Sequence, residues 1–281
     1  MFQKLKSAWP WLAAILSGLL CALCFAPFNQ TWIAWIALTP LIAAVWFSGE
    51  NSKRRWLRSL LLGYLAGIVF FTSAFSWLGS LGVLYGSFFL HGLSFLLSIY
   101  LGLHFAFWAW FIGLLRPKDF TASWRNLLVA SLGAAAWVTH EWVRGWLFSG
   151  FGWNGLGVAL HQTWPLIQIS EFTGVTGVSF AVAFVNVVAV TVPFRFFAEA
   201  RTRIMRPHFD LTLTVIGLLG LFAFGLRVAQ SPGPSQPLRI AAVQANVPQL
   251  EKFDPQFTRD IFDKFTRLSE IALRADRKSV V

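Results

Sequence analysis

The sequence predicts an α-helical multi-pass membrane protein with about seven transmembrane helices, followed by the beginning of an α/β domain. Three observations predict this class. Of the 281 residues, 56% are hydrophobic and only 12% are charged, and the mean hydropathy is +0.61. Several uncharged runs reach the length of about 20 apolar residues that a transmembrane helix needs. Short clusters of Lys and Arg separate these runs, as is typical of membrane topology.

The net charge of the chain is strongly basic, with a formal value of +11. A basic chain can bind nucleic acid, but here the Lys and Arg residues flank apolar runs in short clusters. Basic residues in such places favour anionic lipid headgroups. We therefore expect the membrane, and no nucleic acid, as the partner of these clusters.

The first half of the chain contains two long uncharged runs, and each is too long for one crossing. Turn residues near 27–30 divide the first run into spans at about 9–26 and 31–48. Glycines near 79–82 divide the second run into spans at about 59–77 and 84–115. The last of these exceeds what a bilayer needs, so we expect it to be tilted, bent or extended past the surface.

Three further spans are expected at about 126–146, 166–194 and 209–227, which completes a transmembrane domain over residues 1–228. Basic residues occur before the first span and in the loops after the second, fourth and sixth spans, whereas the loops near 27–30 and 78–83 have none. By the positive-inside rule the N-terminus is cytoplasmic. The loop that follows the fifth span and all residues after 228 then face the opposite side.

The chemistry of the chain changes after a Pro- and Ser-rich linker at 229–237. Residues 238–247 read as a buried strand. Asp254 and Pro255 are typical of a helix start, and the apolar residues that follow them recur at helical spacing. Ser279 begins a second apolar segment. Strand, helix and strand open an α/β domain, which we expect to be incomplete in residues 238–281 because so short a segment cannot enclose a core.

The segment Glu141–Gly157 joins two opposite charges to a loop rich in glycine and aromatic residues. Glu141 and Arg144 are three residues apart, so on a helix they share a face and can pair. Ionisable residues within a membrane segment are costly and are a functional-site hypothesis by default. The alternative is that Arg144 extends to the headgroups and Glu141 only neutralises it. The glycine-rich loop, which permits tight backbone paths, favours a functional surface.

Cys21 and Cys24 are the only two cysteines, and both lie in the first apolar run. A Cys-x-x-Cys pair can serve redox chemistry or bind a metal, but no His or acidic residue is near it in sequence. We expect buried, inert thiols. The spacing of the histidines matches no metal site either, so the sequence predicts no metal and no cofactor.

Several local patterns, in this order along the chain, resemble apolipoprotein N-acyltransferase. They are Phe25–Phe28, Glu141–Gly157, Gly174–Phe180 and Val243–Asp254. The resemblance covers essentially the whole chain. The chain departs from the family where it has Gly152 for the usual Pro, Val158 for Tyr, Ala245 for Gly and Phe253 for Trp.

The resemblance implies an enzyme of the bacterial inner membrane that matures lipoproteins. Members of the family move an acyl chain from a glycerophospholipid to the N-terminal amine of a diacylglyceryl-cysteine, so the implied partners are that phospholipid and the diacylglyceryl-modified apolipoprotein. A nitrilase-like (carbon-nitrogen hydrolase) domain supplies a Glu–Lys–Cys triad, in which the cysteine forms an acyl-thioester. The resemblance places all three residues beyond Val281. It therefore implies an N-terminal part of such an enzyme, inactive alone, and we expect a monomer.

By resemblance, five residues around the loop after the fifth span would contact the lipid. These are Glu141, Arg144, Trp146, Phe151 and Trp153. An arginine can pair with a lipid phosphate, and the aromatic rings can guide an acyl chain. The alternative for Trp146 and Trp153 is an ordinary aromatic belt at the membrane interface. Glu171, at the start of the sixth span, is a further candidate for the network of Arg144.

Two other function classes are compatible with the composition. A channel or transporter would use intramembrane His residues and Glu171 to line a path, but it predicts inverted repeats, and the sequence has no convincing internal repeat. A non-catalytic, lipid-binding membrane remnant is the other alternative. It would leave the apolar face of Phe257, Ile261, Phe265 and Leu268 uncovered, which finished proteins rarely do.

Overall fold

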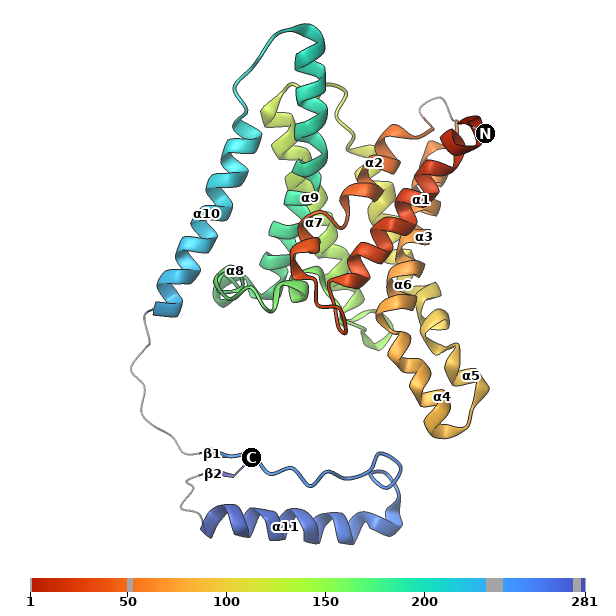
Figure 1. Cartoon of the computed structure of the whole chain (residues 1–281), viewed down its shortest axis with the longest axis vertical. Coiled ribbons are helices and arrows are strands. Elements are labelled where there is room, and N and C mark those ends of the chain that lie inside the picture. The colour runs from red at the N-terminus through yellow and green to blue at the C-terminus, as the bar shows by residue number, and fades with distance from the viewer. Residues whose placement is uncertain (1, 50–52, 231–239, 275–278, 281) are drawn as a thin grey trace. The chain divides into compact units, whose positions relative to one another are not determined.

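The computed structural model describes residues 2–49, 53–230, 240–274 and 279–280. The chain forms two compact units, residues 1–230 and residues 231–281. The first unit is a bundle of helices (Figure 1). The second is a small strand–helix–strand unit.

Each of the seven predicted spans contains a helix, so the helical class is confirmed. The main helices are α1 (Phe2–Leu23), α2 (Thr39–Phe47), α3 (Arg55–Ala74), α6 (Leu93–Leu114), α7 (Ser123–Arg144), α9 (Ser170–Thr202) and α10 (Phe209–Gln230). Within the described residues, α3, α6, α9 and α10 are long and apolar enough to cross a membrane. The number of seven crossings stays a prediction.

Short helices connect these elements. They are α4 (Ser80–Tyr85), α5 (Phe88–His91) and α8 (Trp164–Ile167), with the 3₁₀ turns η1 (Thr31–Trp35), η2 (Ser76–Gly79), η3 (Leu147–Ser149) and η4 (Leu156–Leu160). The predicted span 84–115 is thus interrupted. Gly86 ends α4 in the left-handed conformation, which glycine adopts without steric cost.

The predicted span 31–48 is not one helix, because η1 and the nine-residue α2 divide it. At about 1.5 Å per residue, α2 is only about 14 Å long and does not span a bilayer. The break exposes backbone groups, and Asn186 of α9 satisfies them. Its side-chain Nδ2 donates to the Ala34 carbonyl, and its Oδ1 accepts from the Leu38 N–H, both at 2.8 Å. Broken helices are tolerated within membranes where a neighbouring helix satisfies the freed backbone groups in this way.

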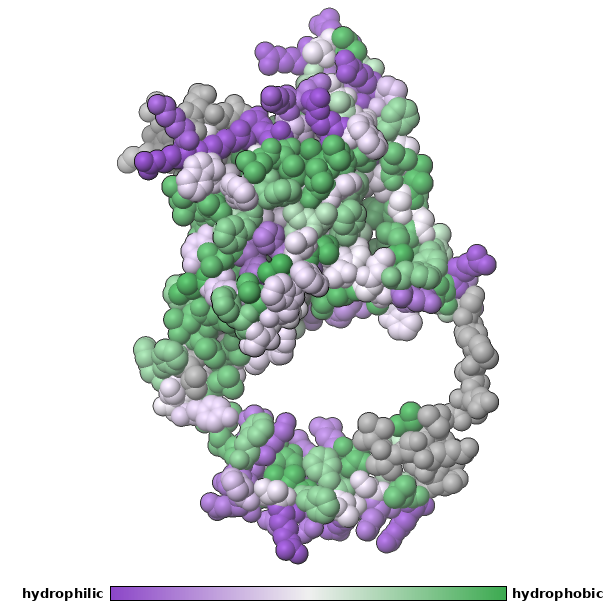
Figure 2. All heavy atoms as spheres, turned by 180° about the vertical axis from the view of Figure 1, so that it is seen from behind, coloured by the Kyte–Doolittle hydropathy of each residue, from purple (hydrophilic) through white to green (hydrophobic). Residues whose placement is uncertain are grey.

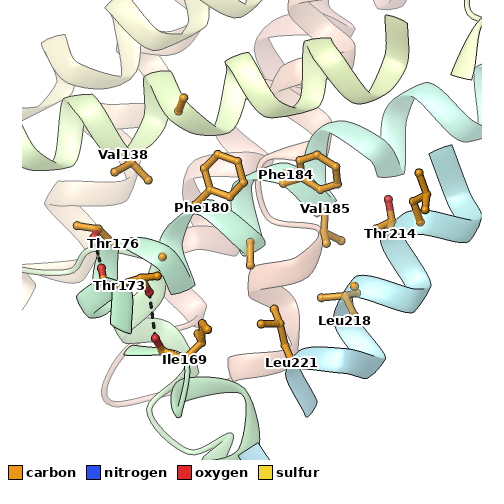
Figure 3. Close-up of a pocket in the computed structure, with 15 residues that line it drawn as sticks. Val138, Ile169, Thr173, Thr176, Phe180, Phe184, Val185, Thr214, Leu218 and Leu221 are labelled. Atoms are coloured by element: carbon orange, nitrogen blue, oxygen red, sulfur yellow. Dashed lines mark hydrogen bonds between the residues drawn. The ribbon is translucent and has the colours of Figure 1, made fainter. Parts of the chain in front are cut away.

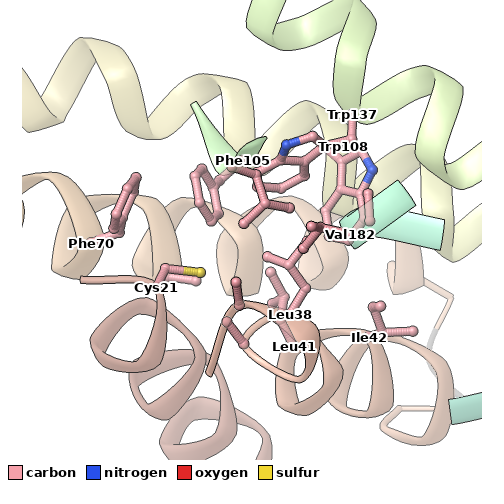
Figure 4. Close-up of a cluster of buried hydrophobic side chains, with 14 of the residues drawn as sticks. Cys21, Leu38, Leu41, Ile42, Phe70, Phe105, Trp108, Trp137 and Val182 are labelled. Carbon is pink, nitrogen blue, oxygen red and sulfur yellow. The ribbon is translucent and has the colours of Figure 1, made fainter. Parts of the chain in front are cut away.

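The core lies where α3 packs along α1 and α6, and where α7 packs along α9. Gly63 and Gly67 let α3 approach α6 closely, since a Cβ on Gly67 would lie 2.7 Å from the Gly102 Cα. Small residues favour such close helix pairs in membranes. Aromatic rings from α3, α6 and α7 meet apolar residues of α1, α2 and α9 in the core (Figure 4). The indoles of Trp46 and Trp108 each donate to a backbone carbonyl, so their N–H groups are satisfied.

Hydrophilic side chains gather at one end of the helical unit, above a broad apolar surface (Figure 2). The loops after α6 and α9 lie at this end (Figure 1). In the loop after α6, the N–H and hydroxyl of Thr121 both donate to Asp119 Oδ1 at 2.8 Å, which lowers the pKa of this carboxyl below its ordinary value. The clustering agrees with the predicted separation of basic and uncharged loops.

The predicted sixth span, 166–194, extends further than expected, because α9 continues to Thr202. Arg195, which the sequence assigns to a basic loop, is instead 1% exposed. Its Nε donates to Glu199 at 2.8 Å and its Nη1 to Asp210 of α10 at 2.9 Å. Asn126 of α7 donates to the second oxygen of Asp210 at 2.7 Å. This buried charge network, formed by Arg195, Glu199, Asp210 and Asn126, joins α7, α9 and α10.

The second unit has a parallel pair of short strands, β1 (Ile240–Ala241) and β2 (Ser279–Val280), in the register Ile240 to Ser279. The turn η5 (Pro255–Phe257) and helix α11 (Thr258–Arg274) connect them. Asp254 caps η5 by accepting from the Gln256 N–H at 2.9 Å, so the predicted helix start is confirmed. The predicted strand 238–247 is much shorter, with 238–239 outside the described residues. Most of the predicted linker also lies outside them, and its first two residues belong to α10.

Candidate functional site

The candidate site lies at the end of α7 that is opposite the basic loops. After Arg144 the chain turns back on the helix, and the Phe151 N–H donates to the Arg144 carbonyl at 2.7 Å. Gly150 makes this path possible. Its φ is +84°, and a Cβ there would lie 2.1 Å from the Gly145 carbonyl oxygen. A side chain at this position would therefore be both strained and blocked.

Glu141 fastens the returning loop to the helix. Its Oε1 accepts from the Trp137 indole N–H at 2.7 Å and from the Leu156 backbone N–H at 2.6 Å. The residue after Leu156 is held from α9, where the Ser179 hydroxyl accepts from the Gly157 N–H at 2.8 Å. Buried backbone donors need acceptors, and these two side chains supply them.

Arg144 lies beneath the same loop and is 4% exposed. Its Nη1 donates to the Trp153 carbonyl at 2.7 Å, and its guanidinium carbon lies 5.2 Å from the centre of the Phe71 ring. The direct ion pair with Glu141 that the helical spacing allows is not formed, because no acidic side chain of the described residues lies within 4.0 Å of this guanidinium. Both side chains turn to backbone groups of the loop, which would otherwise be buried without partners.

The aromatic residues of the loop divide into two groups. Trp153 stacks on Trp77 with ring centres 5.8 Å apart, and Phe151 lies 6.0 Å from Trp153 and 5.2 Å from Phe75. Trp146 instead pairs with Trp142 at 5.4 Å. Trp146 and Trp153 are both more than half exposed. The structure thus places Phe151 and Trp153 against Trp77 and Phe75, and gives Trp146 a different neighbour.

A small cavity of about 20 Å³ lies beside Arg144. Arg144, Glu141, Asn154, His104 and His140 are its polar lining residues, and the rings of the two histidines are 6.1 Å apart. A space of this size holds about one water molecule. It does not admit a phosphate, so a lipid headgroup reaches Arg144 only if the loop moves.

Some residues of the candidate site could not be predicted from the sequence. His104 and Trp77 come from α6 and η2, far from Glu141–Gly157 in the chain, and no local pattern distinguishes them from other aromatic residues of the apolar runs. Glu171 does not join the network of Arg144, because its side chain is exposed and makes no hydrogen bond or ion pair within the described part of the chain.

The chain is similar to known proteins over most of its length. Residues 17–188 match the family model described as apolipoprotein N-acyltransferase N-terminal domain. The apolipoprotein N-acyltransferase of Geobacter metallireducens is 32% identical over 268 residues, covering 94% of this chain and 49% of that protein. That of Methylococcus capsulatus is 33% identical over 248 residues, covering 87% and 45%, and that of Haemophilus influenzae is 28% identical over 258 residues, covering 88% and 44%.

The chain spans about half the length of the curated relatives it matches. The family model, however, covers more than half of the chain itself. The chain belongs to the apolipoprotein N-acyltransferase family.

Proposed function

We propose that this chain forms the membrane part of an enzyme that transfers an acyl chain from a glycerophospholipid to the N-terminal amine of diacylglyceryl-cysteine in lipoproteins. Family membership and the long apolar helices support this reading. The clustering of hydrophilic residues at one end supports a cytoplasmic N-terminus in a bacterial inner membrane, with the residues after 228 on the opposite side. The parallel strand–helix–strand unit supports the opening of a nitrilase-like domain.

The proposed role of the site at the end of α7 is to hold the phospholipid. The observation that carries this proposal is Arg144, a buried cation that forms no direct ion pair in the described part of the chain and lies beside an exposed aromatic stack. Among the described residues the Trp153 carbonyl is the one hydrogen-bond acceptor of this guanidinium, and a buried charge with so few partners is costly. A phosphate would supply two oxygens in the geometry that guanidinium binds best.

Lipid binding then requires the loop to exchange partners. The phosphate replaces the Trp153 carbonyl at Arg144, while Glu141 keeps the loop attached through the Leu156 N–H. Trp153, Phe151 and Trp77 offer apolar ring faces at the depth where tryptophan prefers to lie. In this proposal Glu141 positions the loop, and Arg144 with the rings contacts the lipid.

Replacing Arg144 with alanine is expected to weaken phospholipid binding about tenfold or more, since hydrogen bonds to charged groups contribute about 1.5–3 kcal/mol. The measurement is native mass spectrometry of the purified chain, titrated with phosphatidylethanolamine. Arg144→Lys keeps the charge but loses the two-pronged geometry, and should bind with intermediate affinity.

Arg201→Ala is the matched control, because Arg201 is an exposed arginine in the last turn of α9. Thermal unfolding of each variant separates loss of binding from loss of fold. Unchanged phospholipid affinity in folded Arg144→Ala would remove Arg144 from the site.

The 281 residues by themselves are expected to form no acyl-thioester. Their two cysteines are Cys21 and Cys24, both buried in the core, and the Cys24 thiol contacts the Leu20 carbonyl at 3.2 Å. Acyl transfer to a thiol needs an accessible thiolate beside a base. The assay incubates the chain with phospholipid that carries an alkyne-tagged acyl chain and measures label released by hydroxylamine. Label above that of the Cys21→Ser, Cys24→Ser double variant would contradict the expectation.

A further inference from the structure

A second apolar site lies between α7, α9 and α10, away from Arg144. It is a cavity of about 740 Å³, and it shares no lining residue with the small cavity beside Arg144. Val138 of α7, Phe180 and Phe184 of α9, and Leu218 and Leu221 of α10 project toward this space (Figure 3). A space of this volume is in the range of ligand sites, about 300–1,000 Å³.

The cavity exists because α10 is held at its two ends and not in its middle. Near its start, Asp210 bonds to Arg195 and Asn126. Near its end, Gly225 touches α8 so closely that a Cβ there would lie 1.7 Å from the Pro165 carbonyl oxygen. Between them, a Cβ built on Gly217 has no heavy atom within 4 Å. The space is open along one side, so its apolar walls stay exposed unless an occupant covers them.

The lining leaves no polar group for that occupant to satisfy. Its polar side chains are Thr173, Thr176 and Thr214. Each hydroxyl already donates to a carbonyl of its own helix, Thr173 to Ile169, Thr176 to Thr173 and Thr214 to Asp210. Apolar cavities do not retain water. The occupant is therefore apolar along its whole length.

Size and surroundings identify the occupant. A helix about 10 Å wide that crosses a hydrocarbon core of about 30 Å takes up on the order of 2,400 Å³, which is more than the space between these helices offers. The neighbouring face of α10 carries Val215 and Ile216, which are 45% and 58% exposed, as is typical of lipid-facing positions. The cavity is thus continuous with a surface that acyl chains cover. We propose that it binds an acyl chain of a membrane phospholipid.

A second, smaller cavity supports a lipid with two chains. It measures about 410 Å³ and shares Val185 and Leu218 with the first. One chain of a diacyl phospholipid lies in the larger cavity, and the smaller cavity takes the other. An acyl chain that moves from the bilayer into the cavity gains no hydrophobic free energy, because lipid tails are as apolar as leucine. Binding comes from van der Waals contact with walls that otherwise face a void, so it depends on the shape of the cavity.

The test uses the whole 281-residue chain in vesicles of phosphatidylethanolamine and phosphatidylglycerol. A small share of the phosphatidylethanolamine carries a photoreactive diazirine near the end of one acyl chain. After illumination, peptide mass spectrometry measures the label on Phe180 and Phe184, which line the cavity, and on Ile216, which does not. Gly217→Phe fills the cavity. Gly220→Phe is the matched control, because a Cβ there also meets open space but Gly220 does not line the cavity.

The expected result is label on Phe180 and Phe184 in the unaltered chain. In Gly217→Phe this label falls about fivefold or more, which corresponds to about 1 kcal/mol of lost affinity. Label on Ile216 stays constant, and Gly220→Phe behaves as the unaltered chain. Circular dichroism checks folding, and Gly217→Leu replaces the larger substitution if Gly217→Phe does not fold. The proposal is overturned if Phe180 and Phe184 carry no label in the unaltered chain, which would be the result if protein and not lipid covered these side chains. It is also overturned if filling the cavity leaves their label unchanged. An equal loss in both variants would overturn it as well.

Discussion

Arg195→Ala is expected to lower the free energy of unfolding by about 3–5 kcal/mol, the usual cost of removing one partner of a buried ion pair. Arg195 is the cation between Glu199 and Asp210, which are 1% and 0% exposed. Its Nη2 also donates to the Pro207 carbonyl at 2.7 Å. Without the guanidinium, two carboxylates and a carbonyl remain buried next to one another. The direct ion pair between α9 and α10 is lost with it.

Thermal unfolding in detergent micelles measures this effect. Arg201→Ala removes the same side chain six residues later from an exposed position of α9 and should change stability little. Replacing all three charged residues, Arg195→Met with Glu199→Leu and Asp210→Leu, should recover much of the loss, since apolar residues can replace a buried ion network. A single-variant loss no larger than that of Arg201→Ala would contradict the buried network.

Gly63→Leu is expected to destabilise the bundle by about 3 kcal/mol, the upper part of the range for overpacking a core. A Cβ on Gly63 would lie 2.4 Å from the Ala109 Cβ and 2.5 Å from the Phe105 carbonyl oxygen. Neither atom is the end of a flexible side chain, so the leucine must push α3 away from α6. This pair of helices has the most extensive contact in the unit, and its separation opens the core beside Phe105.

Gly220→Leu provides the matched comparison for Gly63→Leu. It makes the same substitution in a helix of the same unit, where a Cβ would meet open space. The two variants are compared by their midpoints of thermal unfolding in the same detergent. Equal midpoints would mean that α3 and α6 are not in close contact at Gly63.

Part of the candidate site can be predicted from the sequence. The segment Glu141–Gly157 stands out because charges and glycines are rare in apolar runs, and the structure does bring Glu141, Arg144, Phe151 and Trp153 into one compact loop. The hydrogen-bond partners of the two charges are backbone groups of the loop, which the sequence did not indicate. Helical spacing shows that Glu141 and Arg144 can pair. It gives no information about the backbone groups of a loop that folds back over both side chains and binds them instead.

The sequence alone indicates a helical membrane protein, because composition and the length of apolar runs report directly on the bilayer as a solvent. It also determined the start of the helix after Asp254, since capping depends on neighbouring residues alone. The tertiary structure decided that Arg195 is buried, that Asn186 repairs a broken helix, and that α10 stands apart from α9 in its middle. Each of these depends on which distant helix lies opposite. Periodicity specifies the apolar face of a helix but not its partner, because in a membrane lipid and protein can cover that face equally well.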